Sequence, residues 1–199
     1  MKLGLDFDNT LIDYDLIFYE TALKLGLIDK NIKKSKKSVR NYLVKRNQEH
    51  KFTFLQGEVY GKEIINAEKS EGMFDSLKQL KNKGVHLHIV SHKTKKPIIG
   101  ENYNLHKAAK DWLEKNSFFD KDGLNLNKSD VYFEEKKEYK IRRINSLRLT
   151  HFIDDLESIL DLIDDRIIKI HFNKDKSEGL NSKYKSFSHW DKLGQLNLI

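Results

Sequence analysis

Short apolar runs alternate with helical patterns along this chain. Apolar residues recur at three- and four-residue spacing over Met73–Lys83 and again over Ile141–Leu147, a spacing that is typical of amphipathic helices. Strands are expected near residues 2–8, 85–91, 130–133, 150–153 and 167–172. Because strands separated by helices predict a parallel sheet, we expect an α/β protein.

One long segment interrupts this alternation after the first strand. From Asp13 to about Gly72 the apolar positions follow a helical period, and a basic run extends from Lys30 to Arg46. At 199 residues the chain is long enough to bury a sizeable core. We expect residues 1–13 and 73–199 to form an α/β core, and residues 14–72 to form a helical insertion.

The first predicted strand carries a charge at a position that should be apolar. Asp6 lies between Leu5 and Phe7, and Asp8 follows in the next turn. A buried carboxylate costs several kcal/mol unless a partner compensates it. One interpretation is structural, with either aspartate accepting backbone hydrogen bonds and Thr10 capping a helix. The other interpretation is a catalytic strand end.

A second strand also ends in carboxylates. The apolar run that closes at Ile153 is followed by Asp154 and Asp155. If this strand lies beside the first in a parallel sheet, the carboxyl ends of both open into one crevice. Carboxylates gathered there repel one another, and a hard divalent cation offsets the repulsion. Mg²⁺ is therefore the expected cofactor.

A hydroxyl ends a third predicted strand. Val85, Leu87 and Ile89 alternate with histidines before Ser91. On the residues alone, Ser91 either contributes to the same crevice or simply ends a strand or caps a helix.

These motifs together resemble the haloacid dehalogenase (HAD) superfamily over nearly the whole chain. The resemblance rests on the D-x-D-x-T pattern from Asp6 to Thr10, the later Ser91, a downstream lysine and the final acidic pair. It implies a three-layer Rossmann-like fold with strand order 3-2-1-4-5. It also implies that the insertion is a small helical cap that closes over the crevice and contacts the substrate.

The resemblance further implies a role for each acidic residue. Asp6 would be the nucleophile that forms an aspartyl-phosphate, and Asp8 the general acid and base. The cation would be held by the Asp6 side chain, the Asp8 backbone carbonyl and Asp154. Asp155 would be either a further ligand or a partner through water. Thr10 and Ser91 would contact the phosphoryl group.

The active-site lysine implied by the resemblance has three candidates, Lys136, Lys137 and Lys140. Lys140 ranks first because it lies about fourteen residues before Asp154, as in relatives with a short linker. Lys137 ranks second. Such a lysine neutralises the nucleophile and the phosphate oxygens, whereas the alternative for any one of them is a solvated helix face. Beyond Ser91, either Lys93 or His106 is a further candidate for binding an anion at the mouth of the crevice.

The overall charge of the chain favours negatively charged binding partners. A net charge of +7 and a pI near 9.3 attract anions. Nucleic acid is not favoured, because the Lys30–Lys37 cluster has no interleaved aromatic residues on which bases could stack.

There is no cysteine for disulfide or thiolate chemistry. No apolar run is long enough for a membrane span and the first residues already read as a strand, so we expect a cytoplasmic protein without a signal peptide or membrane partner.

The sequence thus predicts a magnesium-dependent phosphatase. Its expected partner is a small phosphorylated metabolite, and an aspartate at position 8 favours phosphatase over dehalogenase by the resemblance. One alternative is a polynucleotide or nucleotide phosphatase. Another is a protein of the same fold that binds a phosphate ligand without catalysis.

Overall fold

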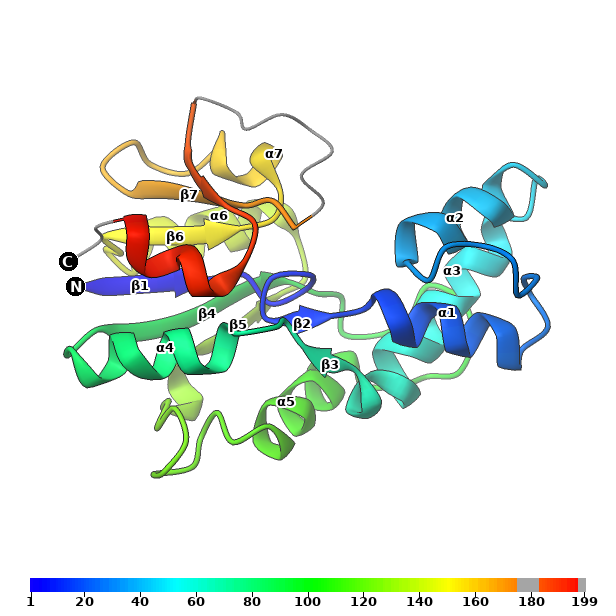
Figure 1. The fold of residues 1–199 in the computed structure, drawn as a ribbon, viewed down its shortest axis with the longest axis horizontal. Helices are drawn as coiled ribbons and strands as arrows, with labels where there is room; N and C mark the ends of the chain where they lie inside the picture. Colours follow the sequence, from blue (N-terminus) through cyan, green and yellow to red (C-terminus); the bar gives the residue numbers. More distant parts are fainter. Residues whose placement is uncertain (175–182, 197–199) are drawn as a thin grey trace. The chain divides into compact units, whose positions relative to one another are not determined.

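The computed structural model describes residues 1–174 and 183–196. Its centre is a six-stranded sheet in the order β5-β4-β1-β6-β7-β8, in which every neighbouring pair is parallel (Figure 1). The strands are β1 (Lys2–Leu5), β4 (His86–His92), β5 (Val131–Glu134), β6 (His151–Asp154), β7 (Ile168–Phe172) and β8 (Lys185–Phe187). The predicted α/β class and the order 3-2-1-4-5 are confirmed, and β8 adds an unpredicted edge strand.

The helices fill the connections between these strands. They are α1 (Asp15–Lys24), α2 (Lys36–Val44), α3 (Glu49–Glu58), α4 (Met73–Asn82), α5 (Leu105–Lys115), α6 (Lys137–Ser146) and α7 (Glu157–Leu160). Shorter elements are a π-helical turn (Val59–Glu63) and 3-10 turns at Ile64–Asn66, Lys128–Asp130 and Trp190–Leu196. A separate two-stranded sheet pairs β2 (Ile12–Asp13) with β3 (Glu68–Lys69).

Both faces of the large sheet are covered, as a parallel sheet requires. Figure 1 shows α4 and the 190–196 turn on one face and α6 with α7 on the other. On the α6 and α7 side, Val90 and Phe152 pack with Ile144 and Leu160, all fully buried. On the α4 side, Ser76 Oγ donates a hydrogen bond to the Trp190 carbonyl at 2.9 Å.

Close packing explains the glycine in β1. A Cβ atom at Gly4 would lie 2.4 Å from Leu149 Cδ1 and 2.5 Å from Phe152 Cδ2, both closer than a real contact allows. The central strand therefore needs a residue without a side chain at this point, so that Phe152 can cover it.

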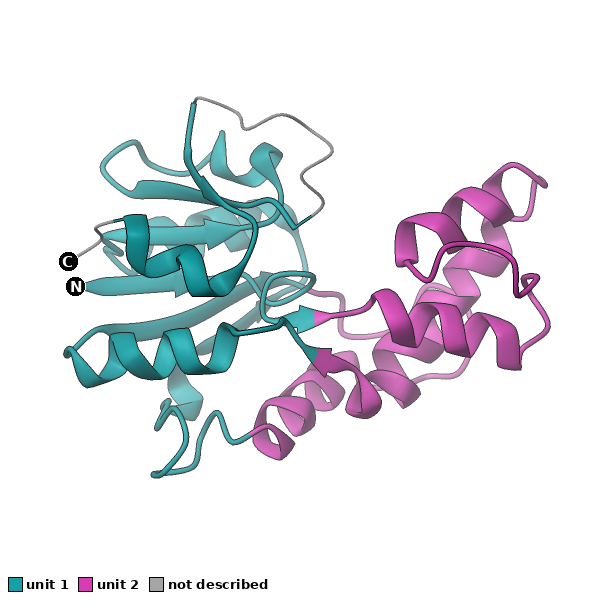
Figure 2. Ribbon diagram, in the orientation of Figure 1, with its two compact units in different colours: residues 1–12, 69–92, 117–199 teal, residues 13–68, 93–116 magenta. Residues whose placement is uncertain are grey.

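The chain forms two compact units (Figure 2). The first comprises residues 1–12, 69–92 and 117–199, and the second comprises residues 13–68 and 93–116. The sequence pattern predicts an insertion of residues 14–72 alone, whereas the second unit also includes α5. The reason is local, because fully buried Trp112 of α5 donates from Nε1 to the Ala67 carbonyl at 2.8 Å.

Several aromatic rings of the second unit contact one another. Tyr60 lies edge-on to Tyr14 and to Phe18, with ring centroids 5.0 and 5.6 Å apart. The Lys36 ammonium lies 5.4–5.6 Å from the centroids of these three rings, within the range of cation–π attraction.

Among residues 1–174 and 183–196, no helix is long and apolar enough to cross a membrane.

The C-terminal aromatic cluster gives a test of the fold. Trp190 is 1% exposed and packs on Phe172 and Phe187, with centroids 5.5 and 5.2 Å away. We expect Trp190→Ala to lower the free energy of unfolding by about 3–5 kcal/mol in urea titrations, because it leaves a cavity.

Trp190→Phe is the matched control. The buried Trp190 Nε1 has no hydrogen-bond partner among the described residues, so phenylalanine keeps a ring and removes an unsatisfied donor. Its loss should be less than half that of the alanine variant. Equal losses in the two variants would contradict this packing.

Candidate active site

The carboxylates of Asp6 and Asp154 meet because β1 and β6 are neighbours in register. Leu5 pairs with Ile153, and the Asp6 amide continues the ladder by donating to the Ile153 carbonyl at 2.9 Å. Asp6 is the first residue after β1, and Asp154 is the last residue of β6. The carboxyl ends of parallel strands lie at one sheet edge, which is where such folds place ligands.

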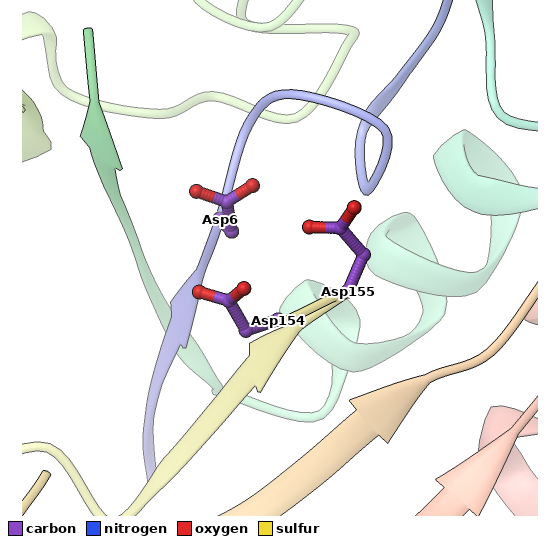
Figure 3. Close-up of side chains that lie close together, drawn as sticks. All are labelled: Asp6, Asp154 and Asp155. Atoms are coloured by element: carbon purple, nitrogen blue, oxygen red, sulfur yellow. The ribbon is translucent and has the colours of Figure 1, made fainter. Parts of the chain in front are cut away.

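Three carboxylates gather at this edge, as Figure 3 shows. One oxygen from each of Asp6, Asp154 and Asp155 lies within 4.8 Å of the others. Asp6 and Asp154 are buried, at 4% and 0% exposed, and Asp155 is partly buried. Of the residues predicted to bind metal, the side chain of Asp8 is not in this group.

The Asp6 carboxylate is held by a hydroxyl and an ammonium. Its Oδ1 accepts hydrogen bonds from Ser91 Oγ at 2.9 Å and from Lys140 Nζ at 2.6 Å. Its Oδ2 lies 3.5 Å from the Thr10 hydroxyl, at the outer limit of a hydrogen bond. The structure thus brings together predicted site residues that are far apart in the sequence.

Lys140 bridges two of the carboxylates. It is 2% exposed, and its Nζ also donates to Asp154 Oδ2 at 2.6 Å. The helix α6 begins at Lys137, four residues before Ile141, where the apolar pattern indicated its start. Lys140 is on the buried side of this helix. Lys137 is partly exposed and Lys136 is exposed, so of the three candidate lysines Lys140 is the one in contact with the cluster.

A tight loop carries the chain away from Asp6. The Phe7 carbonyl accepts hydrogen bonds from the amides of Leu11 at 3.0 Å and Ile12 at 3.2 Å. Asn9 adopts the left-handed region with φ of 58°, which asparagine tolerates better than most residues. Asp8 lies in this loop and is partly buried.

A buried serine from elsewhere in the chain fastens this loop. Ser70 Oγ donates to the Thr10 carbonyl at 2.7 Å, and the Ser70 amide donates to the Leu11 carbonyl at 2.9 Å. These bonds fix the backbone between the two aspartates of the motif and the β2 strand.

Burial and the neighbouring carboxylates shift the pKa values of the acidic side chains in this cluster. Burial, and then the nearby Asp6, raises the pKa of Asp154 to about 7 against the opposing effect of Lys140. Burial, with Asp6 and Asp154, raises the pKa of Asp155 well above its ordinary value. Burial alone would lower the pKa of Lys140, but the carboxylates of Asp6 and Asp154 outweigh it and raise this pKa.

This donor set fits a hard divalent cation. The three carboxylates carry more negative charge than the single ammonium of Lys140 offsets, and carboxylate oxygens are the ligands that Mg²⁺ prefers. A cation at this point would offset the repulsion among the carboxylates, which adds to the effect of burial on the two pKa values.

The fold of this chain is similar to those of several solved structures. The chain is similar to a phosphoserine phosphohydrolase-like protein from Francisella tularensis (TM-score 0.59, 16% identity, 100% of both chains covered). It is also similar to a HAD-superfamily hydrolase from Ehrlichia chaffeensis (TM-score 0.54, 17% identity, 98% of this chain and 94% of that chain covered). A third similar structure is a HAD phosphatase from Thermococcus onnurineus (TM-score 0.52, 16% identity, 98% of this chain and 97% of that chain covered).

This chain has the HAD fold. This assignment rests on the similarity to solved structures. No protein-family model and no curated protein matches the sequence.

Lys93 belongs to the second unit of this HAD fold. It is 4% exposed, its ammonium lies 4.6 Å from the centroid of the Tyr60 ring, and its carbonyl accepts a hydrogen bond from His106 Nε2 at 2.7 Å. Lys93 is therefore buried, and its described contacts are with Tyr60 and His106 of the same unit.

Sequence reasoning missed two residues that contact the acidic pair. Asn9 Nδ2 donates to Asp155 Oδ2 at 3.3 Å, and His171 Nε2 lies 3.2 Å from the Asp155 carbonyl. The position of Asn9 inside the D-x-D-x-T motif is a signal that could have identified it. His171 offers none, because a single histidine in an apolar strand is unremarkable by sequence.

We expect Asp155→Asn to stabilise the metal-free protein at neutral pH. Because the pKa of Asp155 is raised in the folded chain, its ionisation disfavours folding by about 1.4 kcal/mol per pKa unit of that rise. In EDTA at about pH 8, the variant should melt a few degrees above wild type.

The difference in melting temperature should vanish below about pH 3.5, where this carboxyl is protonated in both the folded and unfolded states. Adding Mg²⁺ should stabilise wild type more than the variant. A variant that is less stable than wild type in EDTA at neutral pH would contradict this account of the charge cluster.

Proposed function

We propose that this protein is a magnesium-dependent phosphatase that hydrolyses a small phosphate monoester through an aspartyl-phosphate at Asp6. One observation carries the proposal. The buried Asp6 carboxylate accepts hydrogen bonds from Ser91 at 2.9 Å and Lys140 at 2.6 Å, and it lies beside two further carboxylates at the sheet edge. The HAD fold, with phosphatases among the similar structures, supports it.

Asp6 acts as the nucleophile. Its Oδ1 already accepts two hydrogen bonds, whereas Oδ2 has only the 3.5 Å contact to Thr10 among the hydrogen bonds described. An Asp6 oxygen attacks phosphorus, the bond from phosphorus to the ester oxygen breaks, and the phosphoryl group is transferred to Asp6. Fixing the carboxylate beforehand reduces the entropy cost of this step.

Asp8 supplies and takes the proton. It lies two residues beyond Asp6, in the loop fastened by the Phe7 carbonyl, and its side chain is outside the three-carboxylate group. It protonates the leaving alcohol oxygen as that bond breaks. It then accepts a proton from the water that attacks the aspartyl-phosphate, which releases phosphate and restores the Asp6 carboxylate.

Positive charge and hydroxyl groups stabilise the transferring phosphoryl group. Lys140 and Ser91 donate hydrogen bonds to Asp6, and we propose that they contact phosphoryl oxygens as well. Thr10 and Lys137 are proposed as further phosphate contacts, and Lys93 as an anion contact in the second unit. Mg²⁺ would be held by Asp6, Asp154, Asp155 and the Asp8 carbonyl, and supplies charge stabilisation when bound.

A non-catalytic phosphate-binding role is the main alternative. Such a protein needs cationic and hydroxyl groups around phosphate, but it has no use for a buried carboxylate at the position of the ligand, where it repels an anion. Asp6 is 4% exposed and stands in the centre of the cluster, which favours catalysis.

We expect Asp6→Asn to abolish magnesium-dependent phosphate release, by about a thousandfold or more, because an amide is a poor nucleophile. The assay uses p-nitrophenyl phosphate and a panel of sugar phosphates, amino-alcohol phosphates, nucleotides and phosphorylated oligonucleotides.

Asp75→Asn, an exposed aspartate in the first turn of α4, is the matched control and should retain wild-type activity. Phosphate release by Asp6→Asn at the wild-type rate would exclude Asp6 as the nucleophile. A folded wild-type protein that binds phosphate but releases none from any ester in the panel would favour the binding role.

A further inference from the structure

A buried histidine in β7 contacts the backbone of the acidic pair. His171 is 6% exposed and pairs in register with Asp154 of β6. Its Nε2 lies 3.2 Å from the Asp155 carbonyl oxygen, and its Nδ1 lies 3.3 Å from Glu157 Oε1. The ring is thus placed between the residue that follows β6 and the first residue of α7.

The chemistry of this contact fixes which atom donates. A carbonyl oxygen only accepts hydrogen bonds, so His171 Nε2 carries the hydrogen that it shares with Asp155. The other end of Asp155 is held separately, because Asn9 Nδ2 donates to its Oδ2 at 3.3 Å. Asp155 is therefore held through its main chain by His171 and through its side chain by Asn9.

Asp155 needs such support more than its neighbours do. Asp154 is still within β6 and pairs with β7, whereas Asp155 lies beyond the last residue of the strand. Its carboxylate faces those of Asp6 and Asp154 at close range, and this repulsion tends to push Asp155 away from the cluster. The hydrogen bond from His171 to the Asp155 carbonyl limits that displacement of the main chain.

We propose that His171 is a positioning residue that keeps Asp155 aimed at the cation site and thereby raises its affinity for Mg²⁺. The proposal rests on the proposed function, because it concerns the cation of the same site. Groups that orient metal ligands from behind commonly change metal affinity by about 10–100-fold. His171 itself is not among the residues grouped as possible metal ligands.

The test compares two substitutions at this position. His171→Leu removes the hydrogen bond while keeping an apolar side chain in the sheet. His171→Gln retains a donor, because the glutamine amide nitrogen occupies about the place of the imidazole Nε2. Mg²⁺ dissociation constants are measured by titration calorimetry on the full chain, and melting temperatures are measured in EDTA and in Mg²⁺.

His151→Leu is the matched control. His151 is also a buried histidine of the sheet, at 7% exposed, but it begins β6 and contacts Thr150 Oγ1 at 2.9 Å. It lies three residues before Asp154, about 10 Å along the strand. Its loss removes a buried imidazole from the same sheet without touching Asp155.

We expect His171→Leu to weaken Mg²⁺ binding about tenfold or more, with His171→Gln and His151→Leu close to wild type. Phosphatase activity of the leucine variant should recover when Mg²⁺ is raised, with the KM for the phosphate ester unchanged. Wild-type Mg²⁺ affinity in His171→Leu, or an equal loss in His151→Leu, would overturn the positioning role alone. A wild-type protein that binds no Mg²⁺ would overturn both this inference and the proposed cofactor.

Discussion

The ammonium of Lys140 between the carboxylates of Asp6 and Asp154 is the interaction on which the site depends. Both contacts are 2.6 Å, and all three side chains are nearly inaccessible to solvent. An ion pair buried in this way gains little stability over apolar packing, but losing one partner is costly, because the other charge is left buried and unpaired. Stability alone therefore does not account for the arrangement, which agrees with the proposed role of Asp6 as the nucleophile.

The sheet tolerates this cluster because apolar packing elsewhere offsets it. The strands that carry the acids are central, and Phe152 of β6 packs in a fully buried cluster with Ile144 of α6. Adjacent parallel strands deliver Asp6, Ser91 and Asp154 to one edge from three distant parts of the chain. The same geometry buries the carboxylates and crowds them, and burial first, then their mutual repulsion, raises the pKa values of Asp154 and Asp155. A divalent cation offsets the repulsion, which connects the fold directly to the proposed cofactor.

Much of this could be predicted from the sequence, because the motif residues end apolar strands and those strands have strong local patterns. Asp6, Ser91 and Asp154 each interrupt or close such a run. What depends on tertiary contacts could not be predicted in the same way. The edge strand β8 has only three residues, residues 93–116 join the second unit through contacts such as that of Trp112 with Ala67, and His171 reaches Asp155 only because β7 lies beside β6.

The central claim is that the phosphoryl group is carried by Asp6, and chemical trapping tests it most directly. Borohydride reduces an acyl phosphate to an alcohol but leaves a free carboxylate intact, so a phosphorylated aspartate becomes homoserine. The Asp8→Asn protein, in which hydrolysis of the intermediate is slowed, is mixed with substrate and Mg²⁺, quenched with borohydride, and digested for mass spectrometry. The account predicts homoserine at position 6, dependent on both substrate and Mg²⁺. Homoserine at another aspartate, or none under conditions in which phosphate is released, would contradict it.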